Sequence, residues 1–283
     1  AAFQRVATLN RMMTDYDPES ELMQLRPHPV GQLVPVSEEL FDVLQRAQQV
    51  SALSDGAFDV TAGPLVQLWR RARRQRALPA PERIAEAARA VGYEKRRLDA
   101  RQRTVALLAP GMRLDLGGIA KGYAADQALA VLRERGIRLA MVAASGDIAI
   151  GDPPPREKAW RIGIASIDAG GKELTRIVLL HNAAVSTSGD TEQYVEINSV
   201  RYSHIVDPKT GVGLTNRIGV TIIAKNATTT DSLATAVSVM GVARGLKLVE
   251  SMPGISALIV TLDDEGRKTV TESQGLKKIP TLR

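Results

Sequence analysis

Two short stretches of this chain combine residue types that can bind a cation and a phosphate. The first, LDLGGIAKGYA, contains Asp115, a pair of glycines and Lys121 at the expected start of a helix. The second, DSLATA, places Asp231 and Thr235 four residues apart, on one face of a helix. Oxygen ligands of this kind suit Mg²⁺, which commonly shares its coordination sphere with substrate phosphates. The glycine pair and the free N–H groups of a helix N-terminus suit a phosphate.

Each stretch also has a purely structural interpretation. Asp231 follows two threonines and could cap a helix, with Thr235 packed inside. The glycine pair could form a turn, with Lys121 in solvent. A lysine in the first turn opposes the helix dipole, however, and this favours an anion in front of it. Neither stretch is a Walker loop or a dinucleotide-binding fingerprint, because the GxxxxGK[ST] and GxGxxG spacings are absent.

A third stretch, YSHIVDPKTG, carries His204 at the end of an expected strand. A positioned histidine can act as a general base, although a lone histidine is more often structural and DPKTG is typical of a plain turn. Ser188, His204 and Asp207 could be imagined as a hydrolase triad. The sequence disfavours that interpretation because it has no GxSxG nucleophile elbow.

The composition excludes several classes of protein. With 283 residues and 44% hydrophobic content, the chain can form a sizeable core, in one large domain or two fused lobes. It has no cysteine, which excludes disulfides, thiolate nucleophiles, zinc fingers and iron–sulfur ligation. No apolar run approaches ~18 residues, so we expect no membrane-spanning segment. An export signal or lipid anchor could have been removed ahead of Ala1.

The formal net charge is +6, and part of it lies in the run WRRARRQR at residues 69–76. Binding of nucleic acid would need aromatic or base-reading residues beside such a basic surface, and only 4% of the chain is aromatic. We therefore interpret this run as a solvated helical face and expect no nucleic-acid partner. An acidic partner or a membrane surface stays an alternative.

Hydrophobic periodicity predicts an alternation of helices and strands. Helices are expected over residues 5–25 with a break at 16–20, 37–54, 81–90, 118–135, 231–240 and 243–251, the last two separated at Gly241. Strands are expected over residues 105–108, 139–144, 160–165, 176–181, 184–187, 193–197, 201–206, 218–224, 256–262 and 268–272. Helices dominate the first part and hairpin-connected strands the second. This order favours an α+β fold with a largely antiparallel sheet over a doubly wound α/β fold.

Seven segments, taken in series, resemble the ApbE family of FAD:protein FMN transferases. They are YDPESEL from Tyr16, GAFDVT from Gly56, LDLGGIAKGYA, SGDI from Ser145, STSGD from Ser186, YSHIVDPKTG and the DSLATA segment that runs on to Gly241. Several are individually weak. The combination of LDLGGIAKGYA, YSHIVDPKTG and DSLATA in this order is highly specific. The resemblance extends from about Tyr16 to Gly241, which is most of the chain.

The resemblance implies an α+β fold related to the T-fold, with a largely antiparallel sheet and packed helices. It implies Mg²⁺-dependent transfer of FMN from FAD, the substrate, to a Thr or Ser hydroxyl of an acceptor protein, with release of AMP. The chain would be a single domain over residues 1–283. Family members usually begin with a strand that carries Met-Gly-Thr, and we expect this chain to lack that first N-terminal strand.

The resemblance also assigns roles to individual residues. Those expected to contact FAD are Tyr16 at the flavin, Ala57, Phe58 and Asp59 around the isoalloxazine ring, and Asp115 and Lys121, with Lys121 near the phosphates.

The expected Mg²⁺ ligands are the backbone carbonyl of Gly118 and the side-chain oxygens of Asp231 and Thr235. His204 matches the histidine implicated in catalysis. These assignments agree with the chemistry, because phosphoryl transfer depends mainly on positioning and charge neutralisation, and an alcohol nucleophile needs a base.

By the same resemblance the acceptor would be a subunit of an extracytoplasmic or membrane redox protein. The chain itself would be periplasmic, and a missing N-terminal anchor could tie it to the inner membrane. Two other functions stay open. One is an Mg²⁺-dependent FAD pyrophosphatase that gives FMN and AMP with water as the nucleophile. The other is a flavin-binding protein without catalysis, against which intact Lys121, His204, Asp231 and Thr235 argue.

Overall fold

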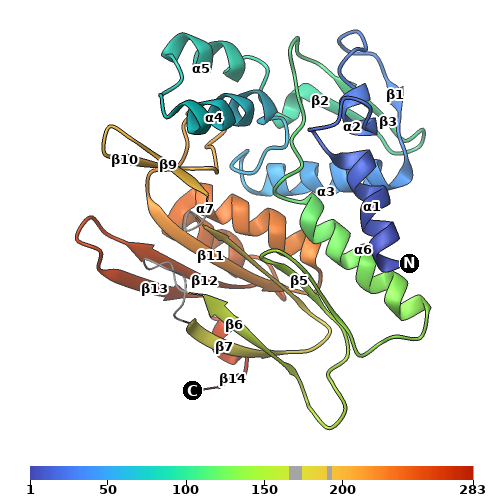
Figure 1. Cartoon of the computed structure of the whole chain (residues 1–283), viewed down its shortest axis with the longest axis vertical. Helices are drawn as coiled ribbons and strands as arrows, with labels where there is room; N and C mark the ends of the chain where they lie inside the picture. The colour runs from blue at the N-terminus through green and yellow to red at the C-terminus, as the bar shows by residue number, and fades with distance from the viewer. Residues whose placement is uncertain (166–173, 190–192, 283) are drawn as a thin grey trace. The chain divides into compact units, whose positions relative to one another are not determined.

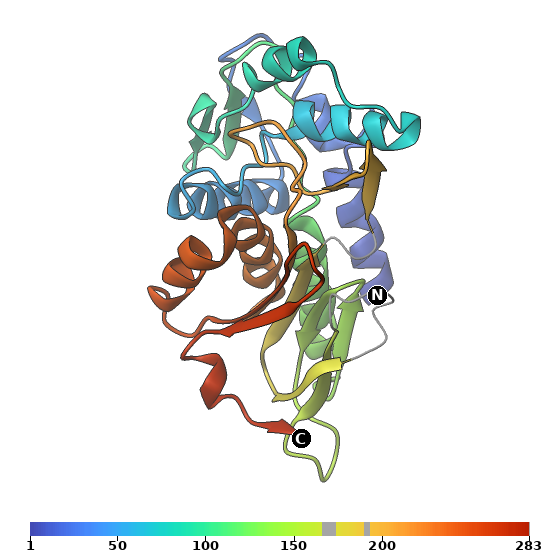
Figure 2. The same cartoon turned by 90° about the vertical axis from the view of Figure 1, so that its left-hand side faces the viewer.

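The computed structural model describes residues 1–165, 174–189 and 193–282, and it divides the chain into two compact units. Unit 1 comprises residues 1–6, 121–193 and 216–283, and unit 2 comprises residues 7–120 and 194–215. Both units are therefore built from segments far apart in the sequence (Figures 1 and 2).

The described helices are α1 (Ala2–Met13), α2 (Glu21–Gln24), α3 (Glu38–Leu53), α4 (Gly63–Gln75), α5 (Pro81–Ala88), α6 (Ala120–Glu134) and α7 (Ala227–Glu250), with short 3₁₀ turns at Tyr93–Lys95 and Leu276–Lys278. The described strands are β1 (Val34–Pro35), β2 (Arg96–Asp99), β3 (Thr104–Leu107), β4 (Met141–Ala144), β5 (Asp147–Ile150), β6 (Trp160–Ala165), β7 (Leu174–Leu180), β8 (Ala184–Gly189), β9 (Tyr194–Ile197), β10 (Val200–Ser203), β11 (Arg217–Ala224), β12 (Ser256–Leu262), β13 (Lys268–Glu272) and β14 (Thr281–Leu282).

Unit 1 is organised around a six-stranded antiparallel sheet in the order β13-β12-β11-β8-β5-β4. Strands β13, β12, β11 and β5 of this sheet are labelled in Figure 1. Alternate residues of its strands serve two different cores, as the pleat requires. Ala149 and Ala184 pack with α6 and the start of α7, while Ile150 and Val185 pack with the small sheet β14-β7-β6. Helices thus cover one face of the large sheet and a second sheet covers the other.

A tight hairpin turn fixes the position of Asp147, the first residue of β5. Ala144 of β4 pairs directly with Asp147, so only Ser145 and Gly146 connect the two strands. Ser145 adopts a left-handed conformation with φ of 60°. This backbone region favours glycine, and two-residue hairpin turns require it. The turn therefore sets Asp147 at the very end of the sheet's β4–β5 hairpin.

The N-terminus of α7 carries two caps. The side chain of Asn226 accepts a hydrogen bond from the N–H of Thr229 at 2.9 Å. The carboxylate of Asp126, on α6, accepts from the N–H groups of Ala227 and Thr228 at 2.7 and 2.8 Å. The structural interpretation of Asp231 as an N-cap is therefore wrong: the helix begins at Ala227, and Asp231 lies one turn inside it.

The predicted break in this helical region is confirmed at Gly241, where the backbone leaves the helix with φ of 75°. By length and composition α7 is one described helix apolar enough to cross a membrane. Half of its most apolar window is buried, and it packs against β8 and β11. In this fold it is a core helix.

Unit 2 consists of helices, the small sheet β1-β3-β2 and the hairpin β9-β10. Helix α3 is capped by Ser37, whose hydroxyl accepts from the N–H of Leu40 at 3.2 Å, as its sequence predicts. Helix α4 buries Leu65, Trp69 and Ala72. The indole N–H of Trp69 donates to the carbonyl of Gly211 at 2.8 Å and so ties the helix to the turn after β10.

The α+β class with antiparallel pairing, predicted from the sequence, is confirmed. The boundaries differ at several points. Strand β10 ends at Ser203, so residues 204–206 lie outside it, and β1, β2, β5 and β14 were not predicted. Asp190, the last residue of the STSGD segment, lies outside the described residues.

Candidate functional site

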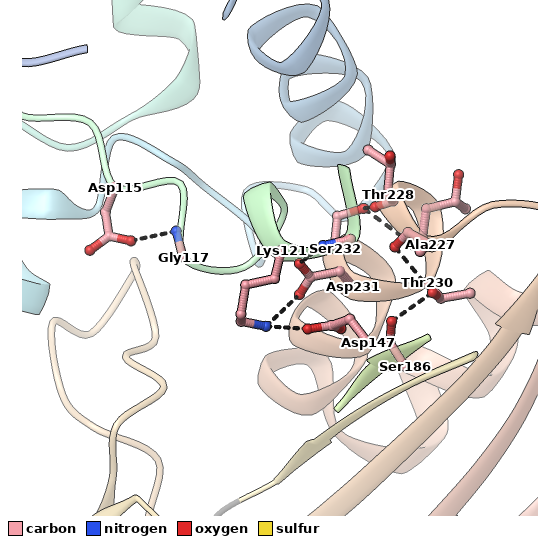
Figure 3. Close-up of polar contacts among 12 residues, drawn as sticks. Asp115, Gly117, Lys121, Asp147, Ser186, Ala227, Thr228, Thr230, Asp231 and Ser232 are labelled. Atoms are coloured by element: carbon pink, nitrogen blue, oxygen red, sulfur yellow. Dashed lines mark hydrogen bonds and ion pairs between the residues drawn. The ribbon is translucent and has the colours of Figure 1, made fainter. Parts of the chain in front are cut away.

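In unit 1, three charged side chains meet where α6, β5 and α7 come together (Figure 3). The ammonium of Lys121 donates a hydrogen bond to the carboxylate of Asp147 and lies 3.5 Å from Oδ1 of Asp231. Both carboxylates are buried, with Asp147 2% and Asp231 4% exposed, whereas the Lys121 side chain is about half exposed at 49%. The lysine therefore approaches the two acids from the solvent side.

Close packing of α6 on α7 places Asp231 at this site. Its Oδ2 accepts a hydrogen bond from the backbone N–H of Gly122 at 3.0 Å. A Cβ atom at Gly122 would lie 2.1 Å from the carbonyl oxygen of Ala227, so only glycine allows the helices to approach this closely. The KG pair of LDLGGIAKGYA thus supplies a cation from its lysine and an anchoring N–H from its glycine.

When both acids are ionised, the two buried carboxylates exceed the single lysine of this cluster by one negative charge. Burial, and then repulsion by Asp147, raise the pKa of Asp231 to about 7 in spite of Lys121 and Gly122. Burial also disfavours the Lys121 ammonium, but its attraction to Asp231 and Asp147 is stronger and raises its pKa. A site with excess buried negative charge and carboxylate oxygens is suited to a hard cation.

The hydroxyl-bearing Thr235 follows Asp231 by one helical turn on α7 and is partly exposed. Asp231 and Thr235 therefore fit Mg²⁺ in donor type and in spacing. No group of three or more His, Cys, Asp or Glu side chains that could hold a metal occurs among the described residues. Backbone oxygens, water and substrate oxygens can supply further ligands of Mg²⁺. Gly118, the third expected ligand, belongs to unit 2.

In unit 2, Arg70 contacts both Asp115 and Tyr16. The sequence had predicted that this arginine belongs to a solvated helical face. Arg70, on α4, donates to Oδ2 of Asp115 at 2.6 Å and also to the carboxylate of Asp15. Its guanidinium carbon lies 4.7 Å from the centre of the Tyr16 ring. Burial raises the pKa of Asp115, and Arg70 opposes that rise. The expectation for the basic run is wrong at Arg70, whose side chain is only 24% exposed.

The GAFDVT segment lies beside Asp115, since the N–H of Asp115 donates to the carbonyl of Val60 at 2.8 Å. Ala57 and Phe58 are buried, at 5% and 4% exposure. Asp59 is buried too and is turned toward its own backbone: Oδ1 accepts from the N–H and the hydroxyl of Thr61, at 2.8 and 2.7 Å. Burial raises the pKa of Asp59. The Asp59 carboxylate therefore stabilises the backbone conformation of the GAFDVT segment.

His204 follows β10 in unit 2 and is exposed, between the buried residues Ser203 and Ile205. The turn that follows is fixed by the hydrogen bond from the Gly211 N–H to the Asp207 carbonyl at 2.8 Å. Ser188 lies on β8 in unit 1. Neither unit by itself contains the imagined Ser188, His204 and Asp207 triad.

Sequence reasoning named nine of these side chains and missed two, Asp147 and Arg70. Asp147 is the first residue of the strand DIAI and follows Gly146. An acid between a glycine turn and an apolar run was the one local feature that could have marked Asp147 as a site residue. Arg70 lies between the buried residues Trp69 and Ala72 in the basic run. Nothing in the local sequence distinguishes it from Arg71 or Arg74. Only the tertiary fold does so.

Comparisons with known proteins show the family of this chain. The family model for the ApbE family matches residues 1–259. A protein from Vibrio cholerae named FAD:protein FMN transferase is 33% identical over 268 residues, which cover 94% of this chain and 79% of that protein. A relative of the same name from Treponema pallidum is 32% identical over 272 residues, covering 91% of this chain and 74% of the relative.

Solved structures agree as well. The flavin transferase ApbE from Vibrio cholerae superposes with a TM-score of 0.89 at 31% identity, covering 99% of this chain and 89% of that one. The ApbE protein from Thermotoga maritima gives a TM-score of 0.86 at 34% identity, covering 98% and 88%. The expected fold is thereby confirmed. On its sequence, its fold and the family match over residues 1–259, this chain belongs to the ApbE family.

Proposed function

We propose that this chain transfers FMN from FAD to a threonine or serine hydroxyl of an acceptor protein, with Mg²⁺ and with release of AMP. The coarser conclusion, that it is a transferase enzyme, follows from its family and its relatives named FAD:protein FMN transferase. The observation that carries the finer proposal is the cluster of Lys121, Asp147 and Asp231 in unit 1. It combines a partly exposed positive charge with buried acidic oxygens, which suit the positioning and charge neutralisation that phosphoryl transfer needs.

The reaction exchanges one bond to phosphorus for another. The acceptor hydroxyl oxygen attacks the phosphorus of the FMN half of FAD, and the bond from that phosphorus to the bridging oxygen breaks. The bridging oxygen leaves on AMP, and the acceptor keeps FMN as a phosphodiester. The hydroxyl proton passes to an imidazole nitrogen of His204, since an alcohol is a poor nucleophile near neutral pH without a base.

Lys121 would balance charge on the pyrophosphate, and its partly exposed side chain lets the ammonium turn from the carboxylates to a phosphate. Asp231, Thr235 and the carbonyl of Gly118 would hold Mg²⁺, which when bound supplies charge neutralisation at the pyrophosphate. Tyr16, Asp115 and the Ala57–Asp59 segment would bind and orient the flavin part.

The acceptor we propose is a subunit of an extracytoplasmic or membrane redox protein, and the chain would work in the periplasm, near or at the inner membrane. Both statements rest on the resemblance to the family. The test of location is fractionation of cells that express the full-length protein, with detection in the periplasmic and membrane fractions.

The activity is tested by incubating the protein with FAD and Mg²⁺ and a library of threonine-containing peptides. A matched library with valine in place of each threonine is the control. Mass spectrometry should find peptides heavier by the FMN group only in the threonine library, and chromatography should find one AMP per modified peptide. The variant Lys121→Met should reduce both signals at FAD concentrations near the wild-type Kd.

AMP and free FMN without peptide modification, at the same rate in both libraries, would instead identify an FAD pyrophosphatase. Binding of FAD without any AMP would identify a flavin-binding protein without catalysis. Either result would contradict the transferase proposal.

A further inference from the structure

The side chain of Arg70, in unit 2, is paired simultaneously with two acids and an aromatic ring. Its two terminal nitrogens are divided between Asp15 and Asp115, and its guanidinium lies over the ring of Tyr16, 4.7 Å from the ring centre. A planar guanidinium can serve two carboxylates and a ring at once, which the ammonium of a lysine cannot do. One side chain therefore links the chain at residues 15–16 to the start of LDLGGIAKGYA.

The backbone position of Arg70 on α4 is fixed by the packing of its neighbours. Its neighbours on α4, Trp69 and Ala72, are 4% and 3% exposed. The indole of Trp69 is also hydrogen-bonded to the carbonyl of Gly211. Arg70 thus extends from a well-packed helix. Tyr16, whose ring its guanidinium contacts, is 78% exposed and lies outside any helix or strand.

An exposed tyrosine ring has several rotamers in solution, and selecting one of them costs conformational entropy. A cation over its face favours one orientation. The same guanidinium fixes the plane of the Asp115 carboxylate, whose other oxygen accepts from the N–H of Gly117 at 2.8 Å. Both groups are therefore oriented before any ligand arrives, and such preorganisation increases affinity.

We propose that Arg70 is a positioning residue of the FAD site, which orients Tyr16 and Asp115 for the flavin without itself taking part in the reaction. This inference rests on the proposed function, in which those two residues contact FAD. It gives the basic run a role that composition alone did not suggest: one arginine of the run serves the substrate, while Arg71 and Arg74 are exposed on the helix surface.

The test measures FAD affinity by calorimetry and FAD turnover for Arg70→Met, Arg70→Lys and the control Arg74→Met, which lies on the same helix and is exposed. Arg70→Met should raise the Kd and the KM for FAD on the order of 10-fold, as for residues that orient metal-binding side chains. Its kcat should stay within about twofold, the pattern of lost uniform binding. Arg70→Lys should recover only part of the affinity, and Arg74→Met should match the wild type.

A merely structural role is separated by a double-mutant cycle with Tyr16→Leu. If Arg70 acts through Tyr16, Arg70→Met should cost clearly less FAD affinity in the Tyr16→Leu background than alone. Equal losses in both backgrounds would overturn the proposal, as would wild-type affinity in Arg70→Met. Should Arg70→Met fold poorly by thermal melting, Arg70→Lys carries the same cycle.

Failure of the proposed function looks different. If the wild-type protein neither binds nor turns over FAD, the function is wrong and this inference falls with it. If the wild type does both and the cycle is additive, only the role of Arg70 is wrong.

Discussion

The ammonium of Lys121 lies 3.5 Å from Oδ1 of Asp231, so the lysine that was expected to face a phosphate faces a buried acid of its own chain. The sequence indicated an anion in front of this lysine, and the anions present are the carboxylates of Asp147 and Asp231. A cation bound by Asp231 would compete with Lys121 for the same oxygens. Lysine and metal are therefore coupled at this site, and both can be tested by substitution.

Asp231→Asn should leave the fold intact and abolish the Mg²⁺ stimulation of FAD turnover, since a neutral amide is a poorer ligand for a hard dication. The amide can still accept from the Gly122 N–H, which keeps α6 on α7. AMP release should be measured against Mg²⁺ concentration, and the Mg²⁺-induced rise in Tm should be measured beside it. A variant with unchanged dependence on Mg²⁺ in both would remove Asp231 from the metal site.

The contribution of the Asp231 carboxyl to the stability of the metal-free protein should fall with rising pH. Its pKa is raised from 3.8 to about 7, so between those values the folded state binds more protons than the unfolded state. The stabilisation from protonated Asp231 is full below about pH 4 and is lost as the pH rises through about 7. The free energy of unfolding of Asp231→Asn, relative to wild type, should therefore increase between pH 4 and pH 8 in urea titrations with a chelator present. A constant difference across this range would contradict the raised pKa.

Lys121→Met should weaken binding of FAD more than binding of riboflavin, because only FAD carries the pyrophosphate. A hydrogen bond to a charged group is worth about 1.5–3 kcal/mol, so the Kd for FAD should rise about tenfold or more. Riboflavin is the internal control for any loss of structure, since the substitution also leaves two buried acids without their cation. An equal loss for both ligands, measured by calorimetry, would place Lys121 away from the phosphates.

Gly122→Ala should destabilise the protein, because the new Cβ would lie 2.1 Å from the carbonyl oxygen of Ala227 and must push α6 from α7. The matched control is Gly189→Ala, where the nearest atom lies at 3.4 Å, an ordinary contact. The Tm should fall by several degrees for Gly122→Ala and little for Gly189→Ala, and the Mg²⁺-dependent rise in Tm should shrink only in the former. Identical melting of the two variants would show that the helices adjust without cost.

His204→Ala should reduce transfer of FMN to peptide by ~10²–10⁴-fold while FAD affinity stays close to wild type, as expected when a general base is removed. The side chain is exposed, so its removal leaves no cavity. Peptide modification and Tm should be measured on the same preparation. A variant that melts earlier but modifies peptide at the wild-type rate would show that His204 only supports the turn at residues 207–211.

The local features of the fold were predictable because their causes are local. Ser37 caps α3, Pro81 opens α5, and Gly241 breaks α7, each by the conformational preference of a single residue type. Periodicity located the long strands. It missed β5, a strand of four residues beginning with a buried acid, because an acid before a short apolar run is equally typical of a loop.

Sequence motifs predicted which residues belong to the candidate site, but not which of the charged residues contact each other. Asp231, Thr235 and Lys121 stand out by type and spacing. Asp147 lies 26 residues from Lys121, and Arg70 lies 45 residues from Asp115, and no periodicity relates residues at such separations. The partner of a charge is decided by the tertiary fold. The capping position of α7 was misjudged for the same reason, since Asp126 reaches it from another helix.

The double cap of α7 has a consequence for where substrate phosphates can be received. The N–H groups of Ala227, Thr228 and Thr229 are all engaged by Asp126 and Asn226, and that of Thr230 already donates to the Asn226 carbonyl. The positive end of the α7 helix dipole is thus already neutralised by the Asp126 carboxylate of the same chain. A phosphate bound near α7 would therefore have to be held by side chains and bound cations and not by the terminus of this helix, and such binding would weaken with rising ionic strength.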